Sequence, residues 1–132
     1  MIILDASALV PVLLNTPEIS QVVQRRIVAS EGDAHVRHVF DLEVMSVLRR
    51  IYFAGQFTEE RADRALYRLE TINITRHSHA PFLRRIREPR HNVTAYEAAY
   101  IALTETLDAP LVTLDGRLAG ASEIRVRVEV VG

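Results

Sequence analysis

The sequence contains no cysteine and no lysine, and all 16 of its basic residues are arginine. The lack of cysteine excludes a disulfide framework, a thiolate metal site and a cysteine nucleophile. The lack of lysine excludes a P-loop lysine and Schiff-base catalysis. No stretch approaches the roughly 18 uninterrupted apolar residues that a membrane-spanning helix needs, so we expect no membrane partner.

The overall composition is typical of a globular domain. The chain has 132 residues, of which 48% are hydrophobic and 25% are charged, and its formal net charge is −1. This length predicts one domain over residues 1–132. The apolar N-terminus carries Asp5 and lacks a basic region, which argues against a signal peptide and favours a cytoplasmic location.

Short apolar segments alternate with longer segments of helical periodicity. We expect strands at residues 2–4, 35–37, 72–75, 111–114 and 125–131. We expect helices at residues 8–14, 18–30, 39–54, 81–87 and 94–107, and one more that begins after Thr58. Strands that alternate with helices in this way indicate an α/β fold with a mostly parallel sheet.

Two aspartates follow segments that we expect to be buried strands. Asp5 comes directly after residues 2–4, and Asp115 comes directly after residues 111–114. Functional groups in parallel sheets collect at the carboxyl ends of strands, so we expect both carboxylates at one edge. Ser7 and Thr113 each lie two residues from one of these aspartates, and the strand period of two predicts that each hydroxyl points the same way as that carboxylate.

Two glutamates are further candidates, and each has an alternative structural explanation. Glu43 lies beside the apolar stripe of the helix expected at residues 39–54. It can face the sheet edge, or it can simply interact with the helix dipole, which is worth ~0.3–1 kcal/mol. Glu97 stands three residues after Thr94, which is the pattern of a capping box. Taken singly, each acid is explained by local structure as well as by chemistry.

Taken together, three segments resemble the PIN-domain family and, within it, the VapC-type toxins of bacterial toxin–antitoxin pairs. They are MIILDASAL, VFDLEVMSVLRR and RHNVTAYEAAYIALTETLDAPLVTLDGRL. The resemblance covers almost the whole chain and implies a three-layer α/β/α sandwich with a central parallel sheet. It also implies a metal-dependent endoribonuclease, whose partners are RNA, a cognate VapB-type antitoxin and a second copy in a homodimer.

The resemblance also implies a role for each acid. Asp5, Glu43 and Asp115 match the family's acidic residues directly, whereas Glu97 stands where the family usually has aspartate. We therefore expect all four to be catalytic and to bind the metal. Supporting polar groups are expected at Ser7, Asn92 and Thr113.

A cluster of carboxylates suits a hard cation, and we expect Mg²⁺ or Mn²⁺. Such ions prefer oxygen ligands and keep several of their waters. A bound cation polarises a phosphate group and lowers the pKa of an attacking water. Without a cation, four neighbouring carboxylates would repel one another, which would raise the pKa of some of them.

Residues 76–91 form a basic segment with five arginines, three histidines and one glutamate. A basic strip beside an acidic cluster suits the backbone of RNA. An alternative is that these arginines form a solvated helix face or pair with the antitoxin. The candidate RNA contacts are Arg84, Arg85, Arg87 and Arg90.

Apolar residues outside the core pattern indicate where a protein partner binds. Leu42, Met45 and Tyr52 lie partly off the main apolar stripe of the helix at residues 39–54. We expect a segment of the antitoxin to cover this leftover apolar surface, while a separate face forms the homodimer that the resemblance implies.

Other functional classes fit the sequence less well. A haloacid-dehalogenase phosphatase needs a second aspartate where this chain has Ser7, and both it and a response-regulator receiver need a lysine. A stronger alternative is a catalytically weak or inactive PIN fold that acts as a binding module and sequesters antitoxin. The departure from the family pattern at Glu97 keeps this alternative open.

Overall fold

The computed structural model describes residues 1–117, 119 and 127–131. Its centre is a parallel sheet with the strand order β3-β2-β1-β4-β5. The strands are β1 (Ile2–Leu4), β2 (Ala34–Arg37), β3 (Thr75–His77), β4 (Leu111–Thr113) and β5 (Val128–Val130). The first strand in the sequence is therefore the central strand of the sheet.

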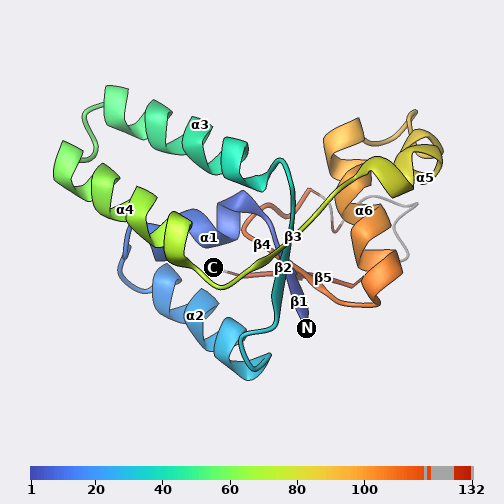
Figure 1. The fold of residues 1–132 in the computed structure, drawn as a ribbon, viewed down its shortest axis with the longest axis horizontal. Coiled ribbons are helices and arrows are strands. Elements are labelled where there is room, and N and C mark those ends of the chain that lie inside the picture. The colour runs from blue at the N-terminus through green and yellow to red at the C-terminus, as the bar shows by residue number, and fades with distance from the viewer. Residues whose placement is uncertain (118, 120–126, 132) are drawn as a thin grey trace.

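Helices cover both faces of this sheet (Figure 1). One side carries α1 (Ala6–Leu13), α2 (Ile19–Ala29), α3 (Phe40–Phe53) and α4 (Glu59–Thr71). The other side carries the 3-10 helix η1 (Ala80–Phe82), α5 (Leu83–Arg87) and α6 (Ala95–Leu107). The predicted α/β/α sandwich with a parallel sheet is confirmed. Within the described part of the chain, no helix is long and apolar enough to cross a membrane.

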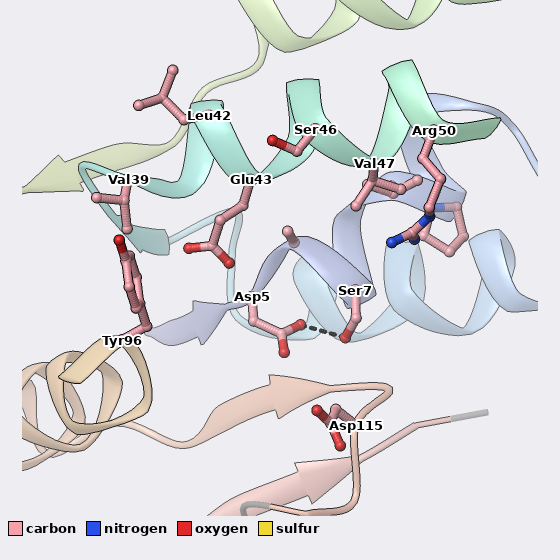
Figure 2. Close-up of a pocket in the computed structure, with 13 residues that line it drawn as sticks. Asp5, Ser7, Val39, Leu42, Glu43, Ser46, Val47, Arg50, Tyr96 and Asp115 are labelled. Carbon is pink, nitrogen blue, oxygen red and sulfur yellow. Dashed lines mark hydrogen bonds between the residues drawn. The ribbon is translucent and has the colours of Figure 1, made fainter. Parts of the chain in front are cut away.

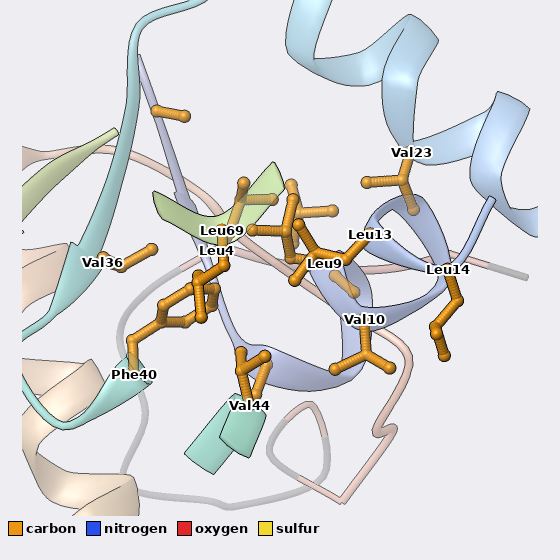
Figure 3. Close-up of a cluster of buried hydrophobic side chains, with 14 of the residues drawn as sticks. Leu4, Leu9, Val10, Leu13, Leu14, Val23, Val36, Phe40, Val44 and Leu69 are labelled. Carbon is orange, nitrogen blue, oxygen red and sulfur yellow. The ribbon is translucent and has the colours of Figure 1, made fainter. Parts of the chain in front are cut away.

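The central strand β1 buries both of its faces, which explains its run of three aliphatic residues. Ile2 and Leu4 belong to a larger core between the sheet and helices α1 to α4, and Ile3 belongs to a smaller core against α6. Figure 3 shows the larger core around Leu4 and Leu9. The three β1 side chains are fully buried, and burial of each such side chain stabilises the fold by ~1.5–3 kcal/mol.

The strand predicted at residues 72–75 is wrong in its boundaries. Helix α4 is followed by Ile72 in an extended conformation, and β3 begins only at Thr75. Ile72 and Ile74 pack against the larger core. Their alternation therefore reflects contact with that core rather than pairing in the sheet, and the ladder with β2 starts at Thr75.

Three further boundaries differ from the predictions or are only partly described. The helix expected from residue 8 begins at Ala6, because the Asp5 side chain caps it. The helix expected over residues 81–87 consists of η1 followed by α5. The last strand, predicted at residues 125–131, is present at the sheet edge as β5 over residues 128–130. Residues 127 and 131 lie outside the strand, and residues 125 and 126 lie outside the described residues.

The carboxyl ends of β1 and β4 lie side by side. Leu4 pairs with Val112 in the parallel ladder, and the Asp5 N–H donates a hydrogen bond to the Val112 carbonyl oxygen at 3.4 Å. Asp5 follows β1 at this edge, and Asp115 follows β4. The two aspartates therefore reach the same edge of the sheet, as their positions in the sequence predict.

Candidate active site

A pocket of about 650 Å³ opens at this edge of the sheet, and we call it the acidic pocket. Asp5, Glu43 and Asp115 line it together with Ser7 and with apolar side chains of α1 and α3. Figure 2 shows Glu43 reaching into the pocket from α3, opposite Asp5 and Asp115. Three of the four acids singled out from the sequence are therefore brought together from well-separated parts of the chain.

Asp5 is buried, with 8% of its surface exposed, and three groups donate hydrogen bonds to its carboxylate. The Ser7 hydroxyl and the Ala8 N–H donate to Oδ1 at 2.6 and 3.0 Å. The Thr113 hydroxyl donates to Oδ2 at 2.5 Å. Because a buried carboxylate is costly unless it is hydrogen-bonded, these donors explain how Asp5 is accommodated at the sheet edge. They also fix the direction of its carboxylate.

The two predicted supporting hydroxyls form one network with Asp5. Ser7 Oγ lies 3.2 Å from Thr113 Oγ1. Ser7 Oγ also accepts from the Leu114 N–H at 3.0 Å, and Thr113 Oγ1 accepts from the Asp115 N–H at 2.9 Å. The network thereby joins the end of β1 to the turn that carries Asp115.

Glu43 forms an ion pair with Arg37, a residue that the sequence reasoning did not single out. Arg37 lies at the end of β2 and is only 3% exposed, whereas the Glu43 side chain is 35% exposed. Burial raises the pKa of the Glu43 carboxyl, the charge of Arg37 opposes this effect, and the nearby charge of Asp5 raises the pKa further. An arginine in a strand covered on both faces is a signal that could have pointed to a buried acidic partner.

Arg37 also contacts α6, across the sheet edge from α3. It donates a hydrogen bond to the Tyr96 carbonyl oxygen at 2.5 Å, and its guanidinium lies 3.4 Å from the ring centre of Tyr100. Among the described residues, Arg37 Nε and the Tyr100 hydroxyl have no hydrogen-bond partner. Burial raises the pKa of Tyr100 far above its ordinary value. One guanidinium therefore joins the two helices that carry Glu43 and Glu97.

Asp115 is held by Arg117 in the same turn. The Arg117 guanidinium binds both carboxylate oxygens, with Nε 3.0 Å from Oδ1 and Nη2 2.6 Å from Oδ2. These hydrogen bonds keep the pKa of Asp115 below its ordinary value. Arg117 is 84% exposed, so water can replace its contacts when it turns away from Asp115.

Glu97 stands apart from the other three acids. Its N–H donates to Thr94 Oγ1 at 3.1 Å, and its carboxylate accepts from the Thr94 N–H at 3.4 Å. The capping box predicted from the sequence is therefore present. Glu97 does not line the acidic pocket, although its charge, after that of Asp115, contributes to raising the pKa of Arg117. Asn92 is exposed in the turn before α6 and does not line the pocket either.

The oxygen donors of the acidic pocket suit a hard divalent cation. Its three carboxylates and the nearby hydroxyls are the ligand types that Mg²⁺ and Mn²⁺ prefer. Within residues 1–117, 119 and 127–131, however, no three acidic or histidine side chains are gathered closely enough to hold a metal ion. In this structure Arg37, Arg117 and Thr94 each hold one of the acids.

The four arginines singled out from the sequence lie outside the acidic pocket. Arg84, Arg87 and Arg90 are exposed. Arg85 instead binds Glu105 at 2.6 Å and Glu88 at 3.1 Å. An arginine that the sequence reasoning missed, Arg50, does line the pocket. Arg50 could have been found from the sequence, because it lies seven residues after Glu43 on the same helix and this spacing puts both side chains on one face.

The chain matches the family model described as PIN domain over residues 2–124. It is similar to ribonuclease VapC9 of Mycobacterium tuberculosis, with 36% identity over 131 residues that cover 99% of this chain and 98% of that relative. It is also similar to ribonuclease VapC1 of the same species, with 36% identity over 130 residues that cover 98% of this chain and 96% of that relative.

Two solved structures share the fold. PAE2754 from Pyrobaculum aerophilum has a TM-score of 0.67 at 21% identity, over 97% of this chain and 82% of that chain. VapC20 of Mycobacterium tuberculosis, a sarcin–ricin loop cleaving toxin, has a TM-score of 0.57 at 18% identity, over 94% of this chain and 98% of that chain. At these identities the two likenesses establish the fold and nothing further.

Proposed function

The chain belongs to the PIN-domain family, and from this premise we propose that it is a metal-dependent endoribonuclease that acts as the toxin of a VapBC-type toxin–antitoxin pair. It hydrolyses phosphodiester bonds of RNA as a single PIN domain over residues 1–132. Relatives that are 36% identical over nearly the whole chain carry the name ribonuclease, which supports this activity.

One observation carries the proposal. Asp5, Glu43 and Asp115 come from the end of β1, from α3 and from the turn after β4, yet they line one open pocket. Arg37 and Arg117 balance the charges of Glu43 and Asp115, whereas only neutral donors hold the buried Asp5 carboxylate. A site that collects a cation accounts for the arrangement of the three acids.

We assign Asp5, Glu43, Asp115 and Glu97 to hold Mg²⁺ or Mn²⁺. When bound, the cation polarises the scissile phosphate and lowers the pKa of an attacking water. The Ser7 and Thr113 hydroxyls keep the Asp5 carboxylate directed at the pocket. Arg117 leaves Asp115, and Glu97 leaves its capping box, when these two acids take part. Asn92 supports the site from the turn before α6.

RNA contact is assigned to arginines around the pocket. Arg50 lines it and forms no ion pair with another described residue. Arg84, Arg87 and Arg90 are exposed and available for phosphate groups. Arg85 forms ion pairs with two glutamates, so we assign it mainly to stabilising the fold and only secondarily to RNA binding.

The proposed protein partners are a VapB-type antitoxin and a second copy of the chain. Leu42 and Met45 of α3 are 71% and 41% exposed, and Tyr52 is 36% exposed. Leu42 also lines the acidic pocket, so an antitoxin segment over this face would cover the entrance for RNA. A guanidinium from such a segment would pair well with the carboxylates beneath it.

Mapping RNA 5′ ends in cells that express the chain without its partner tests this function. We expect new 5′ ends at a restricted set of sites, absent when Asp5→Ala is expressed at the same level. Unchanged RNA ends in cells that accumulate the folded protein would contradict ribonuclease activity.

A specific observation favours a second candidate, an inactive PIN-fold module that sequesters antitoxin. In the described residues every one of the four acids is held by an internal partner, and Glu97 is part of a capping box. Antitoxin binding by a chain that cleaves no RNA with either Mg²⁺ or Mn²⁺ would support this second candidate.

A further inference from the structure

A second cavity of about 300 Å³ lies beside the acidic pocket, and we call it the α5–α6 cavity. The function proposed above does not use it. It is largely apolar and lies between the end of β2, the start of α3, and helices α5 and α6. Its main wall residues are Val39, Leu83, Ile86, Ala95, Tyr96 and Ala99.

The two cavities share a wall. Val39 and Tyr96 line both of them. Figure 2 shows Tyr96 at the side of the acidic pocket, with its hydroxyl end near Val39. The Tyr96 side chain is 66% exposed, so its ring is open to a ligand. A chain-like ligand lying across the acidic pocket therefore reaches the α5–α6 cavity by passing this ring.

The cavity suits an uncharged flat group rather than an ion. Arg37 lines it but is buried, and its charge is matched by Glu43. The imidazole of His79 adds a polar edge to walls that are otherwise apolar. The volume is at the lower end of the range for small-molecule pockets, which leaves room for one aromatic ring system.

One positively charged side chain, that of Arg87, flanks the cavity on α5. Leu83 and Ile86 face it from α5, and at about 100° per residue Arg87 falls next to Leu83 on that helix. Arg84 and Arg87 are exposed, and neither side chain has an ion pair or hydrogen bond with another described residue. An apolar slot with an unpaired arginine, Arg87, at its rim is complementary to a nucleotide, whose base is uncharged and whose phosphate is anionic.

We propose that the α5–α6 cavity is a base-binding subsite, which holds the base of a nucleotide adjoining the scissile phosphate. Tyr96 stacks on that base or on its neighbour, and Arg87 contacts a flanking phosphate. The cavity thereby gives the enzyme a nucleotide preference beside the cut. The position of this subsite next to a cleavage centre rests on the ribonuclease function proposed above, whereas base binding itself does not.

Binding of short RNA in EDTA tests the subsite without cleavage. We would measure the affinity of the full chain for hexanucleotides of A, C and U, in the wild type, in Leu83→Trp and in Leu83→Ala. Leu66→Trp is the matched control, because Leu66 is an accessible leucine on α4, across the sheet. We expect the wild type and Leu66→Trp to prefer one base by about tenfold, which is the scale of one stacking contact.

Leu83→Trp fills the cavity from its exposed rim and should abolish that preference, while Leu83→Ala should shift it toward the larger base. Equal wild-type affinity for the three RNAs would overturn the proposal, as would a preference that Leu83→Trp leaves unchanged. Loss of antitoxin binding in Leu83→Trp, with RNA preference intact, would assign the cavity to the protein partner instead. A base preference in a chain that never cleaves RNA with metal would support the subsite and reject the ribonuclease function.

Discussion

The guanidinium of Arg37 on β2 forms an ion pair with the carboxylate of Glu43 on α3, and it bonds the backbone of α6 at the same time. Through these two contacts Arg37 links two helices that each carry a proposed metal ligand. Loss of a residue that bonds to a metal ligand without touching the metal itself commonly lowers metal affinity or activity by ~10–100-fold. Arg37 is therefore a positioning residue in our account of the site.

Arg37→Met should weaken both the fold and its response to metal. It leaves Glu43 without its partner, and we expect the free energy of unfolding to fall by ~1–3 kcal/mol. The rise in melting temperature on addition of Mn²⁺ should also shrink, because Glu43 is no longer held toward the pocket. Urea unfolding and thermal melts with and without Mn²⁺ measure the two effects.

Arg76→Met is the matched control for this experiment. Arg76 also joins a strand to the first turn of α3, through hydrogen bonds of 2.7 and 2.9 Å to Asp41, but both side chains are about one-third exposed. We expect its loss to cost ~0–1 kcal/mol and to leave the response to Mn²⁺ unchanged. Equal effects of the two substitutions would contradict a special role for Arg37.

The positions of Asp5 and Asp115 could be predicted from the sequence because they depend on local patterns. Asp5 and Asp115 follow apolar strands directly, and parallel pairing brings those strand ends together. The helix pattern left Glu43 with two explanations, and the family resemblance selected the acidic site. The Arg37 contact could not be predicted in this way, because it depends on how β2, α3 and α6 pack. The strand predicted at residues 72–75 was misplaced because its position also depends on packing. Ile72 and Ile74 are partly buried against the larger core, and this gives the same two-residue alternation as a strand.

Glu97 has two competing roles, and one pair of substitutions separates them. If Glu97 binds the metal, Glu97→Gln should reduce RNA cleavage by orders of magnitude and change stability by about 1 kcal/mol or less, because glutamine still serves in the capping box. We expect this result. Glu97→Asp, which restores the usual acid of the family, should keep or raise activity. Full cleavage by Glu97→Gln would leave a site of three acids.

An ion pair at the surface, away from the acidic pocket, should make a pH-dependent contribution to the stability of the fold. Arg26 of α2 binds Glu129 of β5 at 2.6 and 3.0 Å, and this hydrogen bonding lowers the pKa of Glu129. A carboxyl whose pKa is lowered by folding stabilises the fold above its ordinary pKa of about 4.3, and the stabilisation is lost as the pH falls through the lowered value.

Glu129→Gln should therefore lower the melting temperature at pH 7, and its difference from the wild type should narrow once the pH falls below about 4. Thermal melts across this range measure the effect. Glu70→Gln is the control, because Glu70 is exposed and shows no ion pair among the described residues. A Glu129→Gln difference that stays constant with pH would contradict the assignment.

The apolar face of α3 should carry part of the affinity for the antitoxin. We expect Leu42→Ser to weaken binding of the small protein encoded beside this chain by about tenfold or more, because exposed apolar anchors often dominate such interfaces. Val28→Ser is the control, since Val28 of α2 is 75% exposed and lies outside the acidic pocket. Calorimetric titration compares the two. Similar affinities of both variants for the partner would place the interface elsewhere.

Cleavage of a defined RNA by the purified chain, compared with Asp5→Asn, tests the central claim most directly. Asparagine retains the size of Asp5 and its capping contact with α1, so the variant removes the charge at the pocket while a thermal melt verifies its fold. We predict cleavage by the wild type with Mg²⁺ or Mn²⁺, none in EDTA, and a loss of at least about a hundredfold in Asp5→Asn. Cleavage that persists in EDTA, or equally in folded Asp5→Asn, would contradict a metal-dependent nuclease centre in the acidic pocket.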